Sequence, residues 1–154
     1  MAAGKSTLSK QLAAREGAIL LSQDELLDAL FPGAVADLRA FVEYSTRIQV
    51  ALTPHVCSLL SKGVSVVLDF PANTRKQRAW FRQLLDVSHA EHELHFIVAS
   101  DELCKRQLRE RSAERRLTPG TKWTTDADFD DVTAYFDPPS SEEGFNIVRH
   151  ERST

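Results

Sequence analysis

The tetrapeptide Gly4-Lys5-Ser6-Thr7 constrains what this chain can fold into more than any other feature of the sequence. It matches the second half of the phosphate-binding P-loop motif, G-x-x-x-x-G-K-[ST], in which a glycine-rich loop leads into a helix. In such a loop, free backbone N–H groups and the helix N-terminus bind phosphate oxygens. Lys5 would neutralise β- and γ-phosphate charge, and the Ser6 hydroxyl would bind Mg²⁺. The motif therefore predicts a nucleotide-binding α/β domain.

The first glycine of this motif has no counterpart here, because it would fall two places before Met1. The apolar strand that normally delivers that glycine is missing as well. We therefore interpret Met1 as an internal methionine of a longer natural protein, at the third position of the complete motif.

Length and composition are those of one ordinary globular domain. The chain has 154 residues and a net charge of −3, which argues against a protein that coats nucleic acid. Cys57 and Cys104 lie outside any C-x-x-C spacing and are predicted to be reduced thiols rather than zinc ligands. Because the sequence contains neither a membrane span nor a signal peptide, we predict a cytoplasmic protein without a membrane partner.

Hydrophobic periodicity predicts alternating helices and strands. The predicted strands are 18–21, 64–69, 94–99 and 145–148, and the predicted helices are 6–15, 36–62, 74–85, 101–116 and 125–136. Between the first strand and the next helix, residues 22–25 are expected to form a polar break. Pro54 should kink the helix over 36–62 or begin a second segment. This alternation indicates a parallel, doubly wound sheet.

Two acidic residues follow predicted strands at the edge where open α/β sheets bind ligands. Asp24 comes after the first apolar run, and Asp69 ends the second. An apolar strand with a terminal Asp is the Walker B arrangement, in which the carboxylate orders Mg²⁺ or its water shell. Asp24 could instead have a structural role, as the N-cap of a helix that begins with Glu25.

The helix over 101–116 is rich in arginine. Its arginines are Arg106, Arg109, Arg111, Arg115 and Arg116. Five arginines in eleven residues exceed what a solvated helix face needs. A solvated face that pairs with the acidic residues of 126–131 is the alternative to a functional role. Trp80 is predicted to pack in the core, and Trp123, in the adjoining loop, is the better candidate for a substrate contact.

Together with Asn73, Arg75 and Arg78, these features resemble the P-loop kinases over nearly the whole chain. The closest likeness is to the AAA-type or zeta-toxin-like group, which includes the 5′-hydroxyl kinase domain of polynucleotide kinase, chloramphenicol phosphotransferase and gluconate kinase. The resemblance implies one α/β domain over 1–154. It also implies a three-layer P-loop NTPase sheet, mainly parallel and of order 2-3-1-4-5, and a lid over about 101–125.

The resemblance also implies roles for individual residues. Gly4, Lys5, Ser6 and Thr7 would bind ATP, with Thr7 at the α-phosphate, while Ser6 and Asp69 would hold Mg²⁺. Asp24 would accept the proton of the acceptor hydroxyl. Arg111 is the preferred match to the lid arginine on the transferring phosphoryl group, with Arg106 and Arg109 as rivals.

The departure from the family concerns the central first strand, which is missing from this chain. Each buried backbone group left without a partner costs about 1–3 kcal/mol, against a total stability of about 5–15 kcal/mol. A chain that begins at Met1 is therefore expected to be unstable or rearranged.

The predicted function is transfer of the γ-phosphate of ATP to a hydroxyl group. The acceptor is a small molecule or, as the alternative, a nucleic-acid 5′ end. The competing hypotheses are a non-catalytic ATP-binding module that controls a partner protein and an inactive truncated form.

Overall fold

The computed structural model describes residues 4–115, 130 and 133–152, which belong to two compact units. The β1–β2 unit comprises residues 6–72 and 76–91 and contains strands β1 (Ile19–Ser22) and β2 (Val66–Asp69). The β3–β4 unit comprises residues 1–5, 73–75 and 92–154 and contains strands β3 (Leu94–Ala99) and β4 (Ile147–Arg152).

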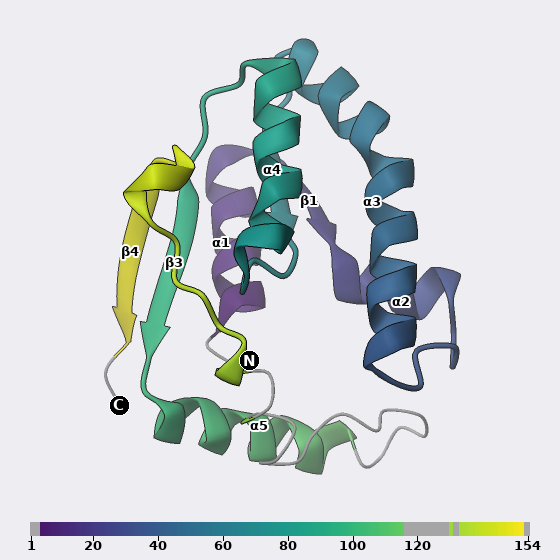
Figure 1. Cartoon of the computed structure of the whole chain (residues 1–154), viewed down its shortest axis with the longest axis vertical. Coiled ribbons are helices and arrows are strands. Elements are labelled where there is room, and N and C mark those ends of the chain that lie inside the picture. Colours follow the sequence, from purple (N-terminus) through teal and green to yellow (C-terminus); the bar gives the residue numbers. More distant parts are fainter. Residues whose placement is uncertain (1–3, 116–129, 131–132, 153–154) are drawn as a thin grey trace. The chain divides into compact units, whose positions relative to one another are not determined.

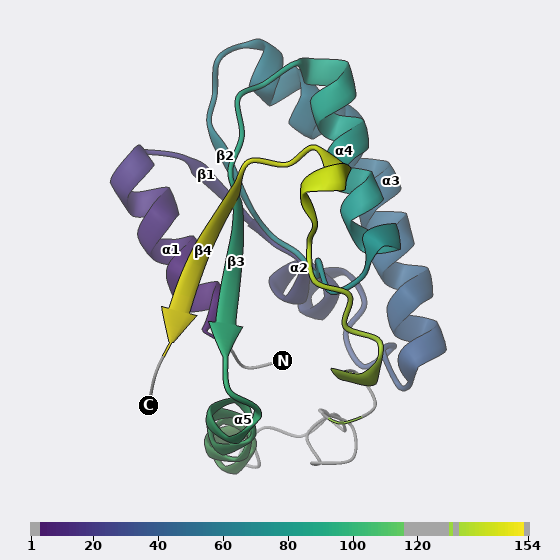
Figure 2. The same ribbon diagram turned by 60° about the vertical axis from the view of Figure 1, so that its left-hand side comes forward.

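In the β1–β2 unit the two strands are parallel and pair in register from Ile19 opposite Val66 to Ser22 opposite Asp69. Four helices surround them, α1 (Lys5–Glu16), α2 (Gln23–Leu30), α3 (Leu38–Ser61) and α4 (Arg75–Ser88). The first residues of α1 and α4 belong to the other unit. Figures 1 and 2 show α3 and α4 side by side next to the strand pair.

Helix α1 confirms the prediction for residues 6–15 and ends in a tight turn. Gly17 adopts a left-handed conformation with a φ of 60°, and the N–H of Ala18 donates to the carbonyl of Ala13 at 2.9 Å. The residues of α1 that are buried are Ser9 and Ala13. Leu8 and Leu12, the leucines of this helix, are only half-buried.

Helix α2 occupies the segment where we predicted a polar break, so that prediction is wrong. Ser22 is the N-cap, and its side chain accepts a hydrogen bond from the backbone N–H of Glu25 at 3.5 Å. Asp24 lies inside the first turn and is therefore not the N-cap. Acidic residues in the first turn interact favourably with the positive end of the helix dipole. Asp24 and Glu25 therefore help α2 to begin directly after β1.

Helix α3 runs through Pro54 without interruption, so the second segment considered at this position does not form. Proline cannot donate to the carbonyl one turn earlier, which weakens a helix locally. Packing offsets that loss, because Ile48 and Val56 on the inner side of α3 are only 3% and 1% exposed.

The core of the β1–β2 unit is made by apolar side chains of α2, α3, α4 and the segment after β2. Its buried members are Leu27, Ile48, Val56, Phe70, Trp80 and Leu84. The rings of Phe70 and Trp80 have their centroids 5.0 Å apart. The prediction that Trp80 packs in the core is confirmed.

In the β3–β4 unit, β3 and β4 are parallel and pair from Leu94 opposite Ile147 to Ala99 opposite Arg152. Helix α5 (Asp101–Arg115) follows β3, and a short 3₁₀ helix, η1 (Ser141–Glu143), precedes β4. Most of the predicted helix over 125–136, and Trp123, lie outside the described residues.

The α/β class and the parallel strands are confirmed. Strands β1, β2, β3 and β4 stand for positions 2, 3, 4 and 5 of the predicted sheet, and the observed pairs β1–β2 and β3–β4 both occur in the order 2-3-1-4-5. The complete order, the three layers and the single domain over 1–154 stay predictions.

Candidate functional site

The carboxyl ends of β1 and β2 bring the two predicted acidic residues to one edge of the β1–β2 unit. Ser22 pairs with Asp69 as the last residue of each strand, and Asp24 follows two residues after Ser22. The carboxylate of Asp69 is buried, with 6% of the residue exposed, whereas Asp24 is exposed in the first turn of α2. The structure thus offers one sheltered and one accessible carboxylate at this edge.

Helix α1 brings the P-loop hydroxyl groups to the same end of the unit. The turn at Gly17 reverses the chain, so the N-terminus of α1 lies toward the end where β1 and β2 terminate (Figures 1 and 2). Ser6 is half-buried and Thr7 is exposed. The first turn of α1 contains no acidic residue. The N-terminus of this helix and its dipole therefore favour an anion.

The donors at this end suit Mg²⁺. Ser6 and Asp69 supply a hydroxyl and a carboxylate oxygen, the hard ligands that Mg²⁺ prefers. Among the described residues, no group of three or more His, Cys, Asp or Glu side chains is arranged to hold a metal ion. Mg²⁺ needs no such group, because it binds through one or two protein oxygens together with water and substrate phosphates.

In the β3–β4 unit, the guanidinium of Arg152 lies against Gly4, which is buried and has a φ of +85°. A Cβ atom at position 4 would overlap that guanidinium, which the flexible Arg152 side chain could relieve by moving. The positive φ is what favours glycine at this position. Sequence reasoning missed Arg152. Little in the sequence pointed to it, because Arg152 lies four residues beyond the end of the last predicted strand.

The predicted lid arginines lie on α5, also in the β3–β4 unit. Arg106 and Arg109 are exposed. Arg111 belongs to the helix, but its side chain lies outside the described residues. Lys105 forms an ion pair with Asp130 at 2.7 Å. This ion pair joins α5 to the acidic segment through a lysine. The alternative interpretation, in which the arginines of α5 pair with that segment, stays a prediction.

The residues around the loop after β2 have structural contacts. The carbonyl of Asn73 accepts a backbone N–H at 2.8 Å. Arg75 donates to the carboxylate of Glu142 at 3.4 Å. Arg78 is fully buried, and its guanidinium donates to the carbonyl of Ala72 at 2.8 Å. Arg78 therefore fixes the backbone that follows Asp69.

Gln23 is the second residue at this edge that sequence reasoning missed. It is 1% exposed, and neither Nε2 nor Oε1 of its amide has a hydrogen-bond partner among the described residues. The Oγ atom of Ser45 on α3 is in the same state, with that residue 8% exposed. Buried polar groups without partners are rare in native proteins.

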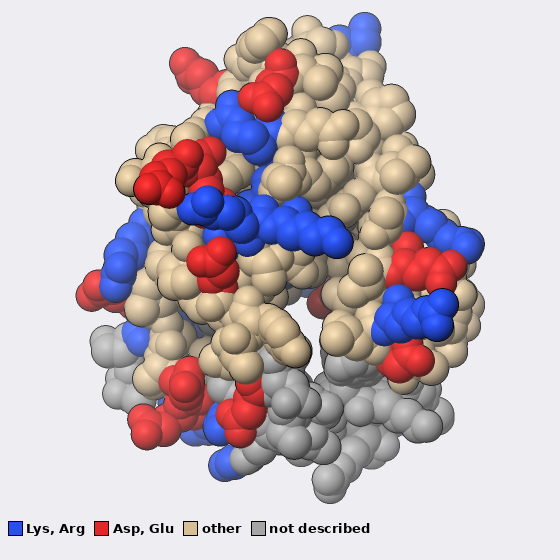
Figure 3. Space-filling model, in the orientation of Figure 1, with Lys and Arg blue, Asp and Glu red and all other residues tan. Residues whose placement is uncertain are grey.

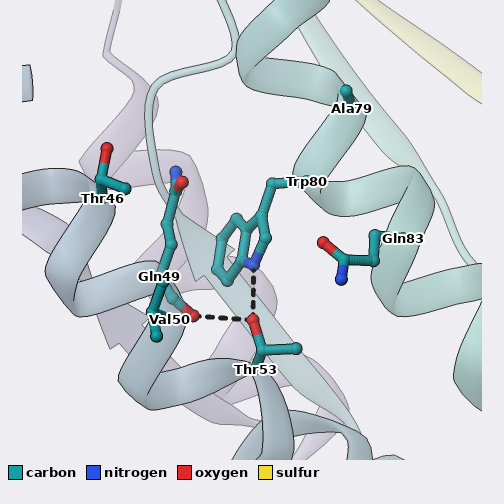
Figure 4. Close-up of a pocket in the computed structure, with 7 residues that line it drawn as sticks. All are labelled: Thr46, Gln49, Val50, Thr53, Ala79, Trp80 and Gln83. Carbon is teal, nitrogen blue, oxygen red and sulfur yellow. Dashed lines mark hydrogen bonds between the residues drawn. The ribbon is translucent and has the colours of Figure 1, made fainter.

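A separate groove lies between α3 and α4, with a volume of about 400 Å³. Figure 4 shows the residues that line it, which are Thr46, Gln49, Val50, Thr53, Ala79, Trp80 and Gln83. The indole N–H of Trp80 donates to the hydroxyl of Thr53 at 2.9 Å, and that hydroxyl donates to the carbonyl of Gln49 at 2.7 Å. None of the seven residues is charged, so the groove offers no group for phosphoryl transfer.

The remaining sequence predictions concern the cysteines and the membrane. Cys57 and Cys104 are free thiols, as predicted. Burial raises the pKa of the Cys104 thiol above its ordinary value, because the apolar surroundings disfavour the thiolate. Within the described part of the chain, no helix is long and apolar enough to cross a membrane.

Comparison with known proteins places the chain in a family. The AAA domain family (AAA_33) matches residues 1–139, and the chain belongs to this family. No curated protein matches it. Among solved structures, it is similar to one described as a "putative kinase" from Chloroflexus aurantiacus J-10-fl. The TM-score is 0.74 at 20% identity, over 97% of this chain and 82% of that one, a likeness that concerns the fold. The α/β fold with its parallel strands is consistent with the P-loop NTPase kinase fold.

Proposed function

We propose that this protein is a phosphotransferase that uses ATP and Mg²⁺ to phosphorylate a hydroxyl group of a small molecule. The observation that carries the proposal is the common edge of the β1–β2 unit, where Ser22 pairs with Asp69 and Asp24 follows. Membership of the AAA domain family supports nucleotide binding. The P-loop sequence at the start of α1 supports the choice of phosphate as the group that is bound.

In this proposal, the residues at the start of α1 hold the nucleotide. Lys5 neutralises the β- and γ-phosphates, Thr7 contacts the α-phosphate, and Gly4 lets the backbone approach. Ser6 and Asp69 hold Mg²⁺, which neutralises charge on the transferring group when it is bound. Because Asp69 is buried at a strand end, its carboxylate is held in one place rather than free in solvent.

Asp24 takes the proton of the acceptor hydroxyl. It is exposed, so an acceptor can reach it, and it belongs to the first turn of α2. The transferring phosphoryl group is further stabilised by a lid arginine of α5, with Arg111 preferred over Arg106 and Arg109. Catalysis then consists of positioning and electrostatic stabilisation rather than covalent chemistry.

A small-molecule acceptor is favoured over nucleic acid by the distribution of charge. On the face shown in Figure 3, Lys and Arg side chains of the described residues stand among Asp and Glu rather than in one broad basic area. The net charge of the chain is −3. A nucleic-acid kinase needs basic surface along the phosphate backbone of its substrate.

The test is ATP consumption in the presence of a panel of hydroxyl acceptors, namely sugars, polyols, nucleosides and a 5′-hydroxyl oligonucleotide. Lys5→Ala should lose ATP binding and turnover, whereas Lys10→Ala, an exposed lysine on the same helix, should keep both. Transfer only to the oligonucleotide would replace the small-molecule acceptor by nucleic acid. ATP binding without transfer to any acceptor would favour the regulatory module.

A further inference from the structure

The buried amide of Gln23 is the polar group in the β1–β2 unit that most needs an explanation. A carboxamide offers two donors and an acceptor with two lone pairs, and in Gln23 neither end is used by another described residue. Taking such a group out of water without compensation is strongly unfavourable. A fold that needed only bulk at this position would be more stable with an apolar side chain of similar size.

The position of Gln23 connects it to the proposed reaction. It is the first residue of α2 and stands between Ser22, the last residue of β1, and Asp24, the proposed base. Gln23 and Leu27 are the buried residues of α2, whereas Asp24 is exposed. The amide is therefore on the inner side of the same helical turn that presents the base to the acceptor.

The second polar group without a partner comes from α3. Ser45 and Ile48 are neighbours on the buried side of α3, and Leu27 of α2 packs in the same apolar cluster as Ile48. The packed faces of α2 and α3 thus contain two neutral groups capable of hydrogen bonds, the Gln23 amide and the Ser45 hydroxyl. Both are uncharged, so they do not compensate a buried charge on a ligand.

We propose that Gln23 is a specificity residue for the acceptor, and that the acceptor is a neutral polyhydroxylated molecule. This rests on the proposed function. One hydroxyl of the acceptor donates to Oε1 of Gln23 and an adjacent hydroxyl accepts from Nε2, while the hydroxyl to be phosphorylated faces Asp24. The Ser45 hydroxyl supplies a further hydrogen bond to the same molecule. An anionic acceptor would leave its charge uncompensated beside these neutral groups.

The test combines stability with binding in one variant, Gln23→Met, which keeps the length of the side chain and removes its polar atoms. Without ligand, the variant should melt about 2–4 °C above the parent chain, because a buried group without partners is lost. In the presence of Mg²⁺ and ADP, neutral polyols such as sorbitol, myo-inositol and glucose should raise the Tm of the parent chain. Glucose 6-phosphate should not.

Gln23→Met should weaken polyol binding by about 10–100-fold, the loss of two hydrogen bonds. It should leave ADP binding unchanged. The matched control is Gln49→Met, which removes an amide from the groove between α3 and α4. It should leave polyol binding as it is in the parent.

Several outcomes would overturn this inference. A lower Tm for Gln23→Met would mean that the amide has a structural partner, and polyol binding equal to that of the parent would mean that it does not touch the acceptor. The inference also fails if no polyol changes the Tm of the parent chain. Failure of the proposed function is a different result, in which polyols bind but ATP is not consumed.

Discussion

In the groove between α3 and α4, the indole N–H of Trp80 donates a hydrogen bond to the hydroxyl of Thr53, and that hydroxyl donates to the carbonyl of Gln49. At the carboxyl edge of β1 and β2, the amide of Gln23 is more deeply buried, with 1% of the residue exposed, and has no partner among the described residues. Both regions belong to the β1–β2 unit and both contain amides and hydroxyl groups. They differ in whether the fold itself uses these polar groups.

This difference separates structural polar groups from functional ones. A polar group that the fold satisfies contributes to stability, and its loss is felt in unfolding. A buried polar group that has no hydrogen-bond partner in the fold lowers stability and is retained for another reason, such as binding a ligand. Substitutions in the groove should therefore change stability, and substitutions at the edge should change activity.

The largest effect is expected at the edge, for Asp24→Asn. Removal of the proposed base should lower kcat by about 10²–10⁴-fold. The Tm should stay close to that of the parent, because Asp24 is exposed. Steady-state kinetics with the best acceptor measures the first quantity, and thermal unfolding measures the second.

Asp28→Asn is the matched control, since Asp28 is an exposed aspartate of the same helix, one turn further on. It should leave kcat within a factor of about two of the parent value, in line with the small effects of surface substitutions. Equal losses of kcat in both variants would assign the effect to the charge of α2 as a whole. A kcat indifferent to Asp24→Asn would remove the base assignment.

The next effect belongs to the groove, for Trp80→Ala. Trp80 is 8% exposed and packs on Phe70 and Phe81, so the truncation should lower the free energy of unfolding by about 3–5 kcal/mol. Urea unfolding measures this. Val50→Ala, at a residue of the same groove that is 70% exposed, should change it by less than about 0.5 kcal/mol. If Trp80→Ala lost activity but not stability, the groove would be functional and the comparison would be reversed.

How much of this could be predicted from the sequence differs between the two regions. Apolar runs that end in an acid predicted β2 and the place of Asp69, because a buried parallel strand needs a continuous apolar segment. The predicted role of Trp80 was also correct. The start of helix α2 was misplaced, because its first residues are polar and the N-cap was considered at Asp24 rather than Ser22. Ser22 and Glu25 nevertheless have the spacing of a capping box.

The burial of Gln23 could not be predicted, because a polar residue directly after a strand is ordinarily exposed. It results from the packing of α2 on α3, which joins residues distant in the sequence. Arg152 escaped for a related reason. The last predicted strand ended at Val148, whereas β4 continues to Arg152 through polar side chains. Backbone pairing with β3 extends the strand there, and hydropathy does not report it.

A smaller effect is expected for Thr53→Val, which tests the hydrogen bonds of the groove without changing its volume. The substitution leaves the indole N–H of Trp80 without its acceptor, at a cost of about 1–3 kcal/mol in the free energy of unfolding. Thr46→Val is the control, because Thr46 is exposed and its hydroxyl donates to the carbonyl of Val42 in its own helix. Equal effects of the two variants would mean that the bond between Trp80 and Thr53 contributes nothing.

The smallest effect is expected for the ion pair of Glu43 and Arg47, which lies on α3 outside both regions. The carboxylate and the guanidinium are 2.7 Å apart, but the side chains are 53% and 61% exposed. Solvent therefore screens the attraction, and a double-mutant cycle with alanine at both positions should give a coupling energy of about 0.3–0.5 kcal/mol. The guanidinium of Arg47 also lies over the ring of Tyr44, 5.5 Å from its centroid. The cycle separates this contact from the ion pair, because replacing Arg47 removes it whether or not Glu43 is present. A coupling energy as large as the Thr53→Val effect would show that short distance alone decides the contribution of a polar contact. Burial would then not explain why polar contacts in the groove contribute more than those on the surface. The contrast between groove and edge would have to rest on activity measurements alone.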